Sequence, residues 1–310
     1  MGGIVAMAAG SVAVPALGQS GQADASVPIF GLGIATIASA VSLAILWKLD
    51  AIRPGSIGRA GHDSPEPRAA IPLALLAFGV FLLPAVFTAI MLGLLRVSFE
   101  DEPTLRDNGI ISGLTYGAGV ALSVAVCWFA AKWKLLKSEN LRPRLRDLWV
   151  GVLALVLAYP LMHLTSLAAS AVYTLSGGQP DSPLQHGTLE LLATGDRASV
   201  WWWAIVAGAV LGAPIVEEVV FRGLLQPAIR AMAGPWVAIL VAGALFTLLH
   251  VPRSPDSGGA TWLAIPTLAV LAIALGIARE RSGRLGVPIV MHIAFNALNV
   301  GLALFLTSNG

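Results

Sequence analysis

The chain contains about eight long apolar runs, and this feature constrains its fold more than any other. We place the runs at residues 27–47, 71–95, 109–131, 148–174, 199–216, 235–250, 261–278 and 285–307. Several approach or exceed the roughly 20 apolar residues that span a bilayer. In lipid, only a helix or a closed barrel satisfies its own backbone hydrogen bonds, and these runs lack the alternation of barrel strands. The sequence therefore predicts an all-α, polytopic membrane protein of about eight transmembrane helices.

The composition agrees with this prediction. Hydrophobic residues make up 56% of the chain and charged residues 12%, whereas about a quarter of a soluble domain is charged. The net charge is only +2, which gives no support to a nucleic-acid partner. Cys127 is the only cysteine, so no internal disulfide can form, and its apolar surroundings indicate packing.

Basic residues in the predicted loops indicate how the chain crosses the membrane. Most of the 19 Lys and Arg fall at 48–70, 132–147, Arg230 and 279–284, which eight spans place on one side. The positive-inside rule assigns that side to the cytoplasm. Residues 1–26 are either a signal peptide, with Ala-Asp-Ala as its cleavage site, or an N-terminus without predicted structure. A signal-like start suggests a bacterial chain, so we expect the bacterial cytoplasmic (inner) membrane.

Two carboxylates lie deep in an apolar run, where an ionisable group costs about 2.5 kcal/mol or more. They are Glu217 and Glu218, and every Asp is expected in a loop or at the edge of a run. Glu218 and Arg222 are four residues apart, so they share a helix face and can form a buried ion pair. Glu217 is rotated by about 100° from Glu218 and needs another partner.

Histidine and asparagine side chains in later runs supply possible partners. His250 ends the sixth run, one turn after Phe246, while His292 and Asn296 are one turn apart in the eighth run. Asn299 lies on nearly the same stripe. Any one of these histidines is more often a core residue than a catalyst. Polar groups in lipid need partners, however, so we expect a hydrated cavity lined by Glu217, His250, His292 and Asn296.

Such a cavity suits hydrolysis by either of two mechanisms. A buried carboxylate can act as a general base on water, and imidazole and amide groups can stabilise an oxyanion. The same residues can instead hold a zinc ion, with Glu217, His250 and His292 as ligands. The residues alone leave both open. His163 is not part of an HExxH motif and is expected to pack or to line a cavity, while His62 and His186 are loop residues.

Three motifs in the last third of the chain resemble those of the CAAX protease and bacteriocin-processing (CPBP, or Abi) family of intramembrane endopeptidases. EExxxR corresponds to Glu217, Glu218 and Arg222. FxxxH corresponds to Phe246 and His250, and HxxxN to His292 and Asn296. The resemblance covers about 199–308. The predicted four-helix segment at 27–174 shows no motif of the family, and a predicted extracytoplasmic loop at 175–198 separates it from the protease-like part.

The resemblance implies a set of roles and a fold. The helices would surround a conical cavity, Glu217 and His250 would activate water, and His292 and Asn296 would support the oxyanion. Three supporting residues are implied, namely Glu218, Arg222 and Phe246. Members of the family are often called metalloproteases, yet the site is similar to that of a metal-free glutamate protease, so either no cofactor or a divalent metal such as zinc is expected. The partners would be membrane lipid and a membrane-associated peptide or protein substrate.

Two other functions are weighed against a protease. The ionisable residues can form the proton relay of a proton-coupled transporter, although the sequence shows no internal repeat. The chain can also be a catalytically silent scaffold or an immunity-type membrane protein that keeps the family fold.

Overall fold

The structure is a computed structural model that describes residues 29–53, 55–59, 65–95, 97, 104–177, 187–251 and 258–308. The segment 1–26, His62 and His186 lie outside the described residues. Every regular element within the described ranges is helical, which confirms the all-α prediction. The conical cavity stays a prediction.

The described elements follow one another as helices joined by short connections. Their bounds are α1 (Ile29–Lys48), α2 (Ser56–Arg59), η2 (Pro67–Ala69), α3 (Ala70–Leu94), α4 (Leu105–Lys132), α5 (Ser138–Leu141), α6 (Leu145–Leu175), α7 (Gly187–Thr194), α8 (Val200–Ala207), η3 (Gly208–Gly212), α9 (Ala213–Glu218), η4 (Val219–Leu225), α10 (Gln226–Ala233), α11 (Pro235–Leu249), α12 (Gly258–Ser282) and α13 (Gly286–Ser308).

Seven helical spans in the described part of the chain are long and apolar enough to cross a membrane, and α11 is a shorter apolar helix of 15 residues. These eight segments correspond to the eight predicted runs. The fifth differs in length, because the predicted run 199–216 is the first half of a continuous helical span over 200–233. The paired glutamates therefore lie in the middle of a span, as their apolar surroundings in the sequence predict. The chain is a multi-pass integral membrane protein.

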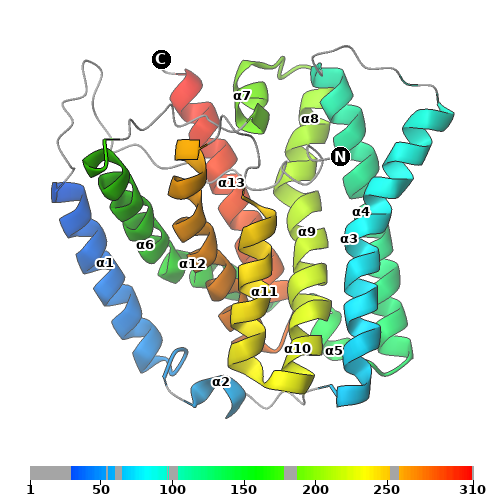
Figure 1. Cartoon of the computed structure of the whole chain (residues 1–310), viewed down its shortest axis with the longest axis horizontal. Coiled ribbons are helices and arrows are strands. Elements are labelled where there is room, and N and C mark those ends of the chain that lie inside the picture. The colour runs from blue at the N-terminus through cyan, green and yellow to red at the C-terminus, as the bar shows by residue number, and fades with distance from the viewer. Residues whose placement is uncertain are drawn as a thin grey trace.

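The C-terminal spans form the centre of the bundle. In the most apolar stretch of the span 200–233, of α12 and of α13, about half of the residues are buried. In the corresponding stretches of α1, α3, α4 and α6, only 17–28% of the residues are buried. Figure 1 shows α3 and α4 paired on one side and α1 beside α6 on the other, with α9, α11, α12 and α13 between them. The four N-terminal spans thus present apolar side chains to the lipid and flank the central helices on two sides.

Glycines allow the central helices to approach their neighbours closely. A Cβ on Gly151 of α6 would lie 2.7 Å from the Cβ of Val290 on α13. A Cβ on Gly212 of η3 would lie 2.6 Å from the Cβ of Tyr116 on α4. Small residues at helix contacts are typical of membrane bundles, where helix association depends on close packing. These contacts fix α13 and the 200–233 span against the outer helices.

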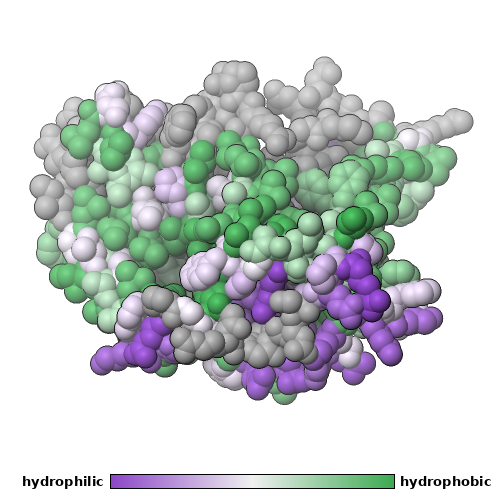
Figure 2. All heavy atoms as spheres, turned by 60° about the horizontal axis from the view of Figure 1, so that its bottom comes forward, coloured by the Kyte–Doolittle hydropathy of each residue, from purple (hydrophilic) through white to green (hydrophobic). Residues whose placement is uncertain are grey.

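Basic segments that are far apart in the sequence meet at one end of the bundle. Arg284 bonds to Asp147 through Nε and Nη2, at 2.7 and 2.8 Å, and to the carbonyl of Arg142 at 2.9 Å. Arg281 donates to the carbonyl of Ser56 at 3.0 Å. Figure 2 shows hydrophilic side chains gathered at this end, below a broad hydrophobic band. The sequence predicts that these basic segments lie on one side of the membrane, which requires them to lie at the same end of the bundle.

Two acidic residues at the ends of membrane helices are buried. Asp147 is the third residue of α6 and is 1% exposed. Glu280 lies in the last turn of α12, where it is buried and accepts hydrogen bonds from Gln226 and Arg230. Both carboxylates have cationic partners, which explains how they are tolerated at buried positions near the membrane surface. The hydrogen bonds from Arg284 to Asp147 raise the pKa of this guanidinium above its usual value.

Candidate active site

The span 200–233 carries the paired glutamates between two π-helical segments. The first, η3, ends at Gly212, and the second, η4, begins directly after Glu218. A π segment widens the turn and breaks the regular hydrogen-bond ladder, and such segments are frequent at functional sites. Glu217 and Glu218 end the six-residue α-helical stretch between them. Their side chains therefore project from a locally irregular part of a long helix.

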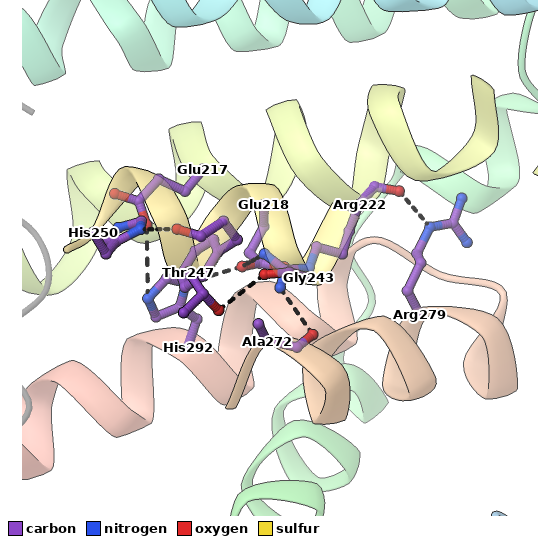
Figure 3. A network of polar contacts seen from close by, with 10 residues as sticks. Glu217, Glu218, Arg222, Gly243, Thr247, His250, Ala272, Arg279 and His292 are labelled. Carbon is purple, nitrogen blue, oxygen red and sulfur yellow. Dashed lines mark hydrogen bonds and ion pairs between the residues drawn. The ribbon is translucent and has the colours of Figure 1, made fainter. Parts of the chain in front are cut away.

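Glu217 faces both predicted histidines. Its Oε2 lies 3.4 Å from Nε2 of His250 and 3.8 Å from Nε2 of His292. The three side chains come from α9, the end of α11 and α13, and Figure 3 shows them pointing toward one another. His250 and His292 are almost fully buried, while the Glu217 side chain keeps 15% of its surface exposed. The sequence prediction that these residues converge is thus matched by their geometry.

The second nitrogen of each imidazole is held by a separate acceptor. His250 Nδ1 lies 2.6 Å from the carbonyl of Phe246, and His292 Nδ1 lies 2.9 Å from Oε1 of Glu218. A carbonyl and a carboxylate only accept hydrogen bonds, so each Nδ1 carries the proton. Each Nε2 is consequently the nitrogen that faces Glu217.

Glu218 and Arg222 form the expected buried ion pair. Nη1 of Arg222 lies 3.0 Å from Oε1 of Glu218, and both side chains have no more than 1% of their surface exposed. Nη2 of Arg222 donates to the carbonyl of Ala272 on α12 at 3.0 Å. The chain of contacts from His292 through Glu218 and Arg222 to Ala272 is visible in Figure 3. This chain connects α13, the 200–233 span and α12.

Phe246 packs at the centre of the same group. Its ring stacks on His250 with centroids 4.1 Å apart and meets the edge of His292 at 5.7 Å. The guanidinium carbon of Arg222 lies 4.6 Å from the centroid of the same ring. Phe246 is 1% exposed. It therefore fixes the planes of both imidazoles and also contacts the cation, in keeping with the supporting position predicted for it.

Asn296 is one turn beyond His292 on α13, but within the described part of the chain its side chain makes no hydrogen bond to Glu217 or to either histidine. Its Nδ2 donates to the backbone carbonyl of Ala209 in η3 at 2.8 Å. The other π segment has a similar contact, because Nε of Arg279 donates to the carbonyl of Arg222 in η4 at 3.1 Å. Carbonyls that leave the regular helical ladder need other partners. Here side chains of α13 and α12 supply them.

Sequence reasoning missed Arg279 and its neighbours in this network. Arg279 was counted with the loop charges, yet it is 7% exposed at the end of α12. Gln226 is fully buried and donates to Glu280 and to the carbonyl of Gly276. A signal was present, since Arg222, Gln226 and Arg230 follow one another at four-residue steps and form a polar stripe along one helix.

His163 and Asn299 do not join the three facing side chains. Both line a pocket between α6, α12 and α13. The expectation that His163 packs or lines a cavity is therefore confirmed.

Glu217, His250 and His292 are the side chains that would hold a zinc ion, since the Nε2 atoms of both imidazoles face Oε2 of Glu217 at 3.4 and 3.8 Å. Two imidazoles and a carboxylate are suitable donor types, and Glu218 behind His292 resembles the carboxylates that orient ligating histidines. The mechanism proposed below uses water and the side chains of this chain.

Comparison with known proteins identifies the segment that carries these residues. Residues 199–298 match the family described as "Type II CAAX prenyl endopeptidase Rce1-like". The match includes Glu217, His250, His292 and Asn296, and it confirms the resemblance to CAAX-type proteases. No curated protein and no solved structure matches the chain.

Proposed function

We propose that the protein hydrolyses a peptide bond of a membrane-associated protein or peptide with a water molecule activated by Glu217 and His250. The match of residues 199–298 to the family of type II CAAX prenyl endopeptidases supports a protease. The observation that carries the proposal is the contact of Glu217 with Nε2 of both imidazoles, at 3.4 and 3.8 Å, from three helices. A carboxylate and an imidazole that share one face are suited to bind and deprotonate water. We expect the protein in the bacterial cytoplasmic membrane.

In the proposed mechanism, Glu217 is the general base. A water molecule bound between Glu217 and His250 attacks the carbonyl carbon of the substrate, and its proton passes to the carboxylate. Nδ1 of His250 stays bonded to the carbonyl of Phe246, so Nε2 faces the water. The buried position of the site favours this step, because fewer solvent molecules compete for the carboxylate.

The tetrahedral intermediate then needs a donor for its oxyanion. We assign this role to His292, with Asn296 one turn away on the same helix. His292 can donate from Nε2 only when it is protonated on both nitrogens, and Glu218 stabilises that cation through Nδ1 at 2.9 Å. Asn296 can contribute if its amide turns from the carbonyl of Ala209. Collapse of the intermediate breaks the C–N bond, and Glu217 returns its proton to the departing amine.

Glu218, Arg222 and Phe246 hold these groups in place without touching the substrate. The Arg222 guanidinium balances the charge of Glu218 at 3.0 Å. Phe246 fixes both rings. Preorganisation of this kind is what allows fixed donors to act in a site of low polarity.

The test is cleavage of membrane-embedded peptides by the purified protein in liposomes. Glu217→Gln removes the base while keeping the size of the side chain, so we expect loss of cleavage with an unchanged unfolding temperature. Glu66→Gln is the matched control, because Glu66 is an exposed residue outside the site. Normal cleavage by the Glu217→Gln variant would refute the mechanism. A pH-driven proton flux in the same liposomes that depends on Glu217, without any cleavage, would favour the transporter.

A further inference from the structure

A small pocket with several polar side chains in its lining lies between α6, α12 and α13. Its lining residues are Tyr159, Met162, His163 and Ser166 of α6, Thr267 of α12, and Phe295 and Asn299 of α13. The volume is about 20 Å³, which is room for one water molecule or one oxygen-bearing group. The mechanism above uses none of these residues.

Two buried side chains in this pocket keep hydrogen-bonding capacity free. Thr267 Oγ1 and Asn299 Nδ2 have no protein hydrogen-bond partner among the described residues. The residues are 8% and 5% exposed. Buried polar groups are nearly always paired, so an unpaired one needs an explanation. Both atoms can donate a hydrogen bond, and they are on two different helices that face one pocket.

A purely structural role would leave Thr267 with a different bond. Buried threonines elsewhere in the bundle donate to a carbonyl of their own helix, as Thr88 does to Pro84 at 2.9 Å and Thr247 does to Gly243 at 3.0 Å. This back-bonding is the usual way to satisfy a hydroxyl in an apolar helix. Thr267 does not use it, so its hydroxyl remains available to a group in the pocket.

The pocket lies at a defined distance from the catalytic residues along α13. Asn299 is seven residues after His292, which is two helical turns, so both side chains share a face. Seven residues rise about 10 Å along the helix. An extended peptide covers about 3.3 Å per residue. A peptide that runs along α13 from His292 therefore reaches the pocket about three residues from its scissile bond.

We propose that this pocket is a substrate subsite that binds a backbone carbonyl about three residues from the scissile bond, with Asn299 Nδ2 and Thr267 Oγ1 as donors. The proposal rests on the proposed peptidase function. An acceptor oxygen suits two free donors, and one such oxygen fits the volume. None of the described residues that line the pocket is Lys or Arg, so a neutral carbonyl suits it better than a carboxylate. The carbonyl replaces water, which can satisfy the same donors when no substrate is bound.

The test compares long and short peptides with wild type, Asn299→Leu and Thr267→Val. One long membrane-embedded peptide extends at least five residues on each side of the bond. Two short peptides stop two residues from the bond, one on the N-terminal flank and one on the C-terminal flank. The readout is the ratio of kcat/KM for the long peptide to that for each short one. Thr88→Val is the control, since its hydroxyl bonds to its own helix and to Thr115, away from the pocket.

We expect wild type to prefer the long peptide over one of the two short peptides by about 3- to 10-fold, the effect of one or two hydrogen bonds. Asn299→Leu and Thr267→Val should each bring that ratio toward one, and Thr88→Val should leave it as in wild type. A ratio near one in wild type would overturn the subsite. So would an equal fall of kcat/KM for all peptides in both pocket variants, because that result indicates a structural role. Failure of wild type to cleave any peptide would instead overturn the proposed function, and the subsite with it.

Discussion

His292 and Glu218 share a hydrogen bond of 2.9 Å between Nδ1 and Oε1, and both side chains are nearly inaccessible to solvent. The carboxylate holds the imidazole proton on Nδ1 and turns Nε2 toward Glu217. In the proposed mechanism, Glu218 therefore acts through His292. A carboxylate behind a functional histidine commonly sets its tautomer and orientation in this way.

We predict that Glu218→Gln lowers kcat by about 10- to 100-fold, the range found for carboxylates that orient histidines at metal sites. Glutamine cannot accept from His292 and Arg222 with the same charge, so the imidazole loses its orientation and its stabilised cation. KM should change little, because Glu218 does not touch the substrate. Steady-state kinetics in liposomes measures both constants, with Glu139→Gln at an exposed position as the control. A variant with wild-type kcat would contradict the role of Glu218.

Arg222→Met should destabilise the protein by about 3–5 kcal/mol, because it leaves Glu218 as a buried charge that has lost its cation. The matched control is Arg68→Met, which removes an ion pair to Glu66 on the surface, where the arginine side chain is 84% exposed. Surface pairs contribute about 0–1 kcal/mol. Thermal unfolding in detergent compares the two variants. Equal losses of stability would mean that the Glu218–Arg222 pair contributes no more than an exposed one.

Gly151→Val should destabilise the bundle by about 1–3 kcal/mol through overpacking. Any Cβ at this position meets Val290 and the carbonyl of Val287, at 2.7 and 2.8 Å. Gly113→Val is the control, because a Cβ on Gly113 of α4 has no heavy atom within 4 Å. The measurement is the unfolding temperature of each variant, and we expect only Gly151→Val to lower it clearly. If both variants unfold at the same temperature, α6 and α13 can separate without loss, and the close contact is not required.

Metal removal should leave peptide cleavage unchanged. In the proposed mechanism, Glu217 and His250 activate water directly, so no metal ion is required. The measurement is cleavage after treatment with 1,10-phenanthroline and dialysis. Loss of activity that added zinc restores would contradict the metal-free mechanism and favour Glu217, His250 and His292 as ligands.

The sequence predicted the helices and the facing groups well, for identifiable reasons. Long apolar runs define membrane helices because lipid offers no partner to the backbone. The same principle predicted that Glu217, His250 and His292 converge, because isolated polar side chains in lipid must meet. The ion pair between Glu218 and Arg222 could be predicted from their four-residue spacing alone, because residues four apart share one face of a helix.

Other contacts depend on geometry that no local pattern reveals. Asn296 was expected beside the reacting groups, yet it bonds to Ala209, because a π segment frees that carbonyl. The bond from Arg284 to Asp147 joins residues 137 positions apart in the chain. Such partners follow from helix packing and from irregular turns, and neither can be derived from residue spacing.

The shortness of α11 determines how deep in the membrane His250 lies. Its 15 residues rise only about 22 Å, against roughly 30 Å for the hydrocarbon layer. It starts at the basic end, and Figure 1 shows that it stops well below the far end of α13. His250, which follows its last residue, is therefore submerged beneath the opposite lipid surface. Under the proposed function, a substrate must lower its scissile bond several ångströms into the acyl chains before hydrolysis can begin, and bonds that remain among the headgroups are out of reach.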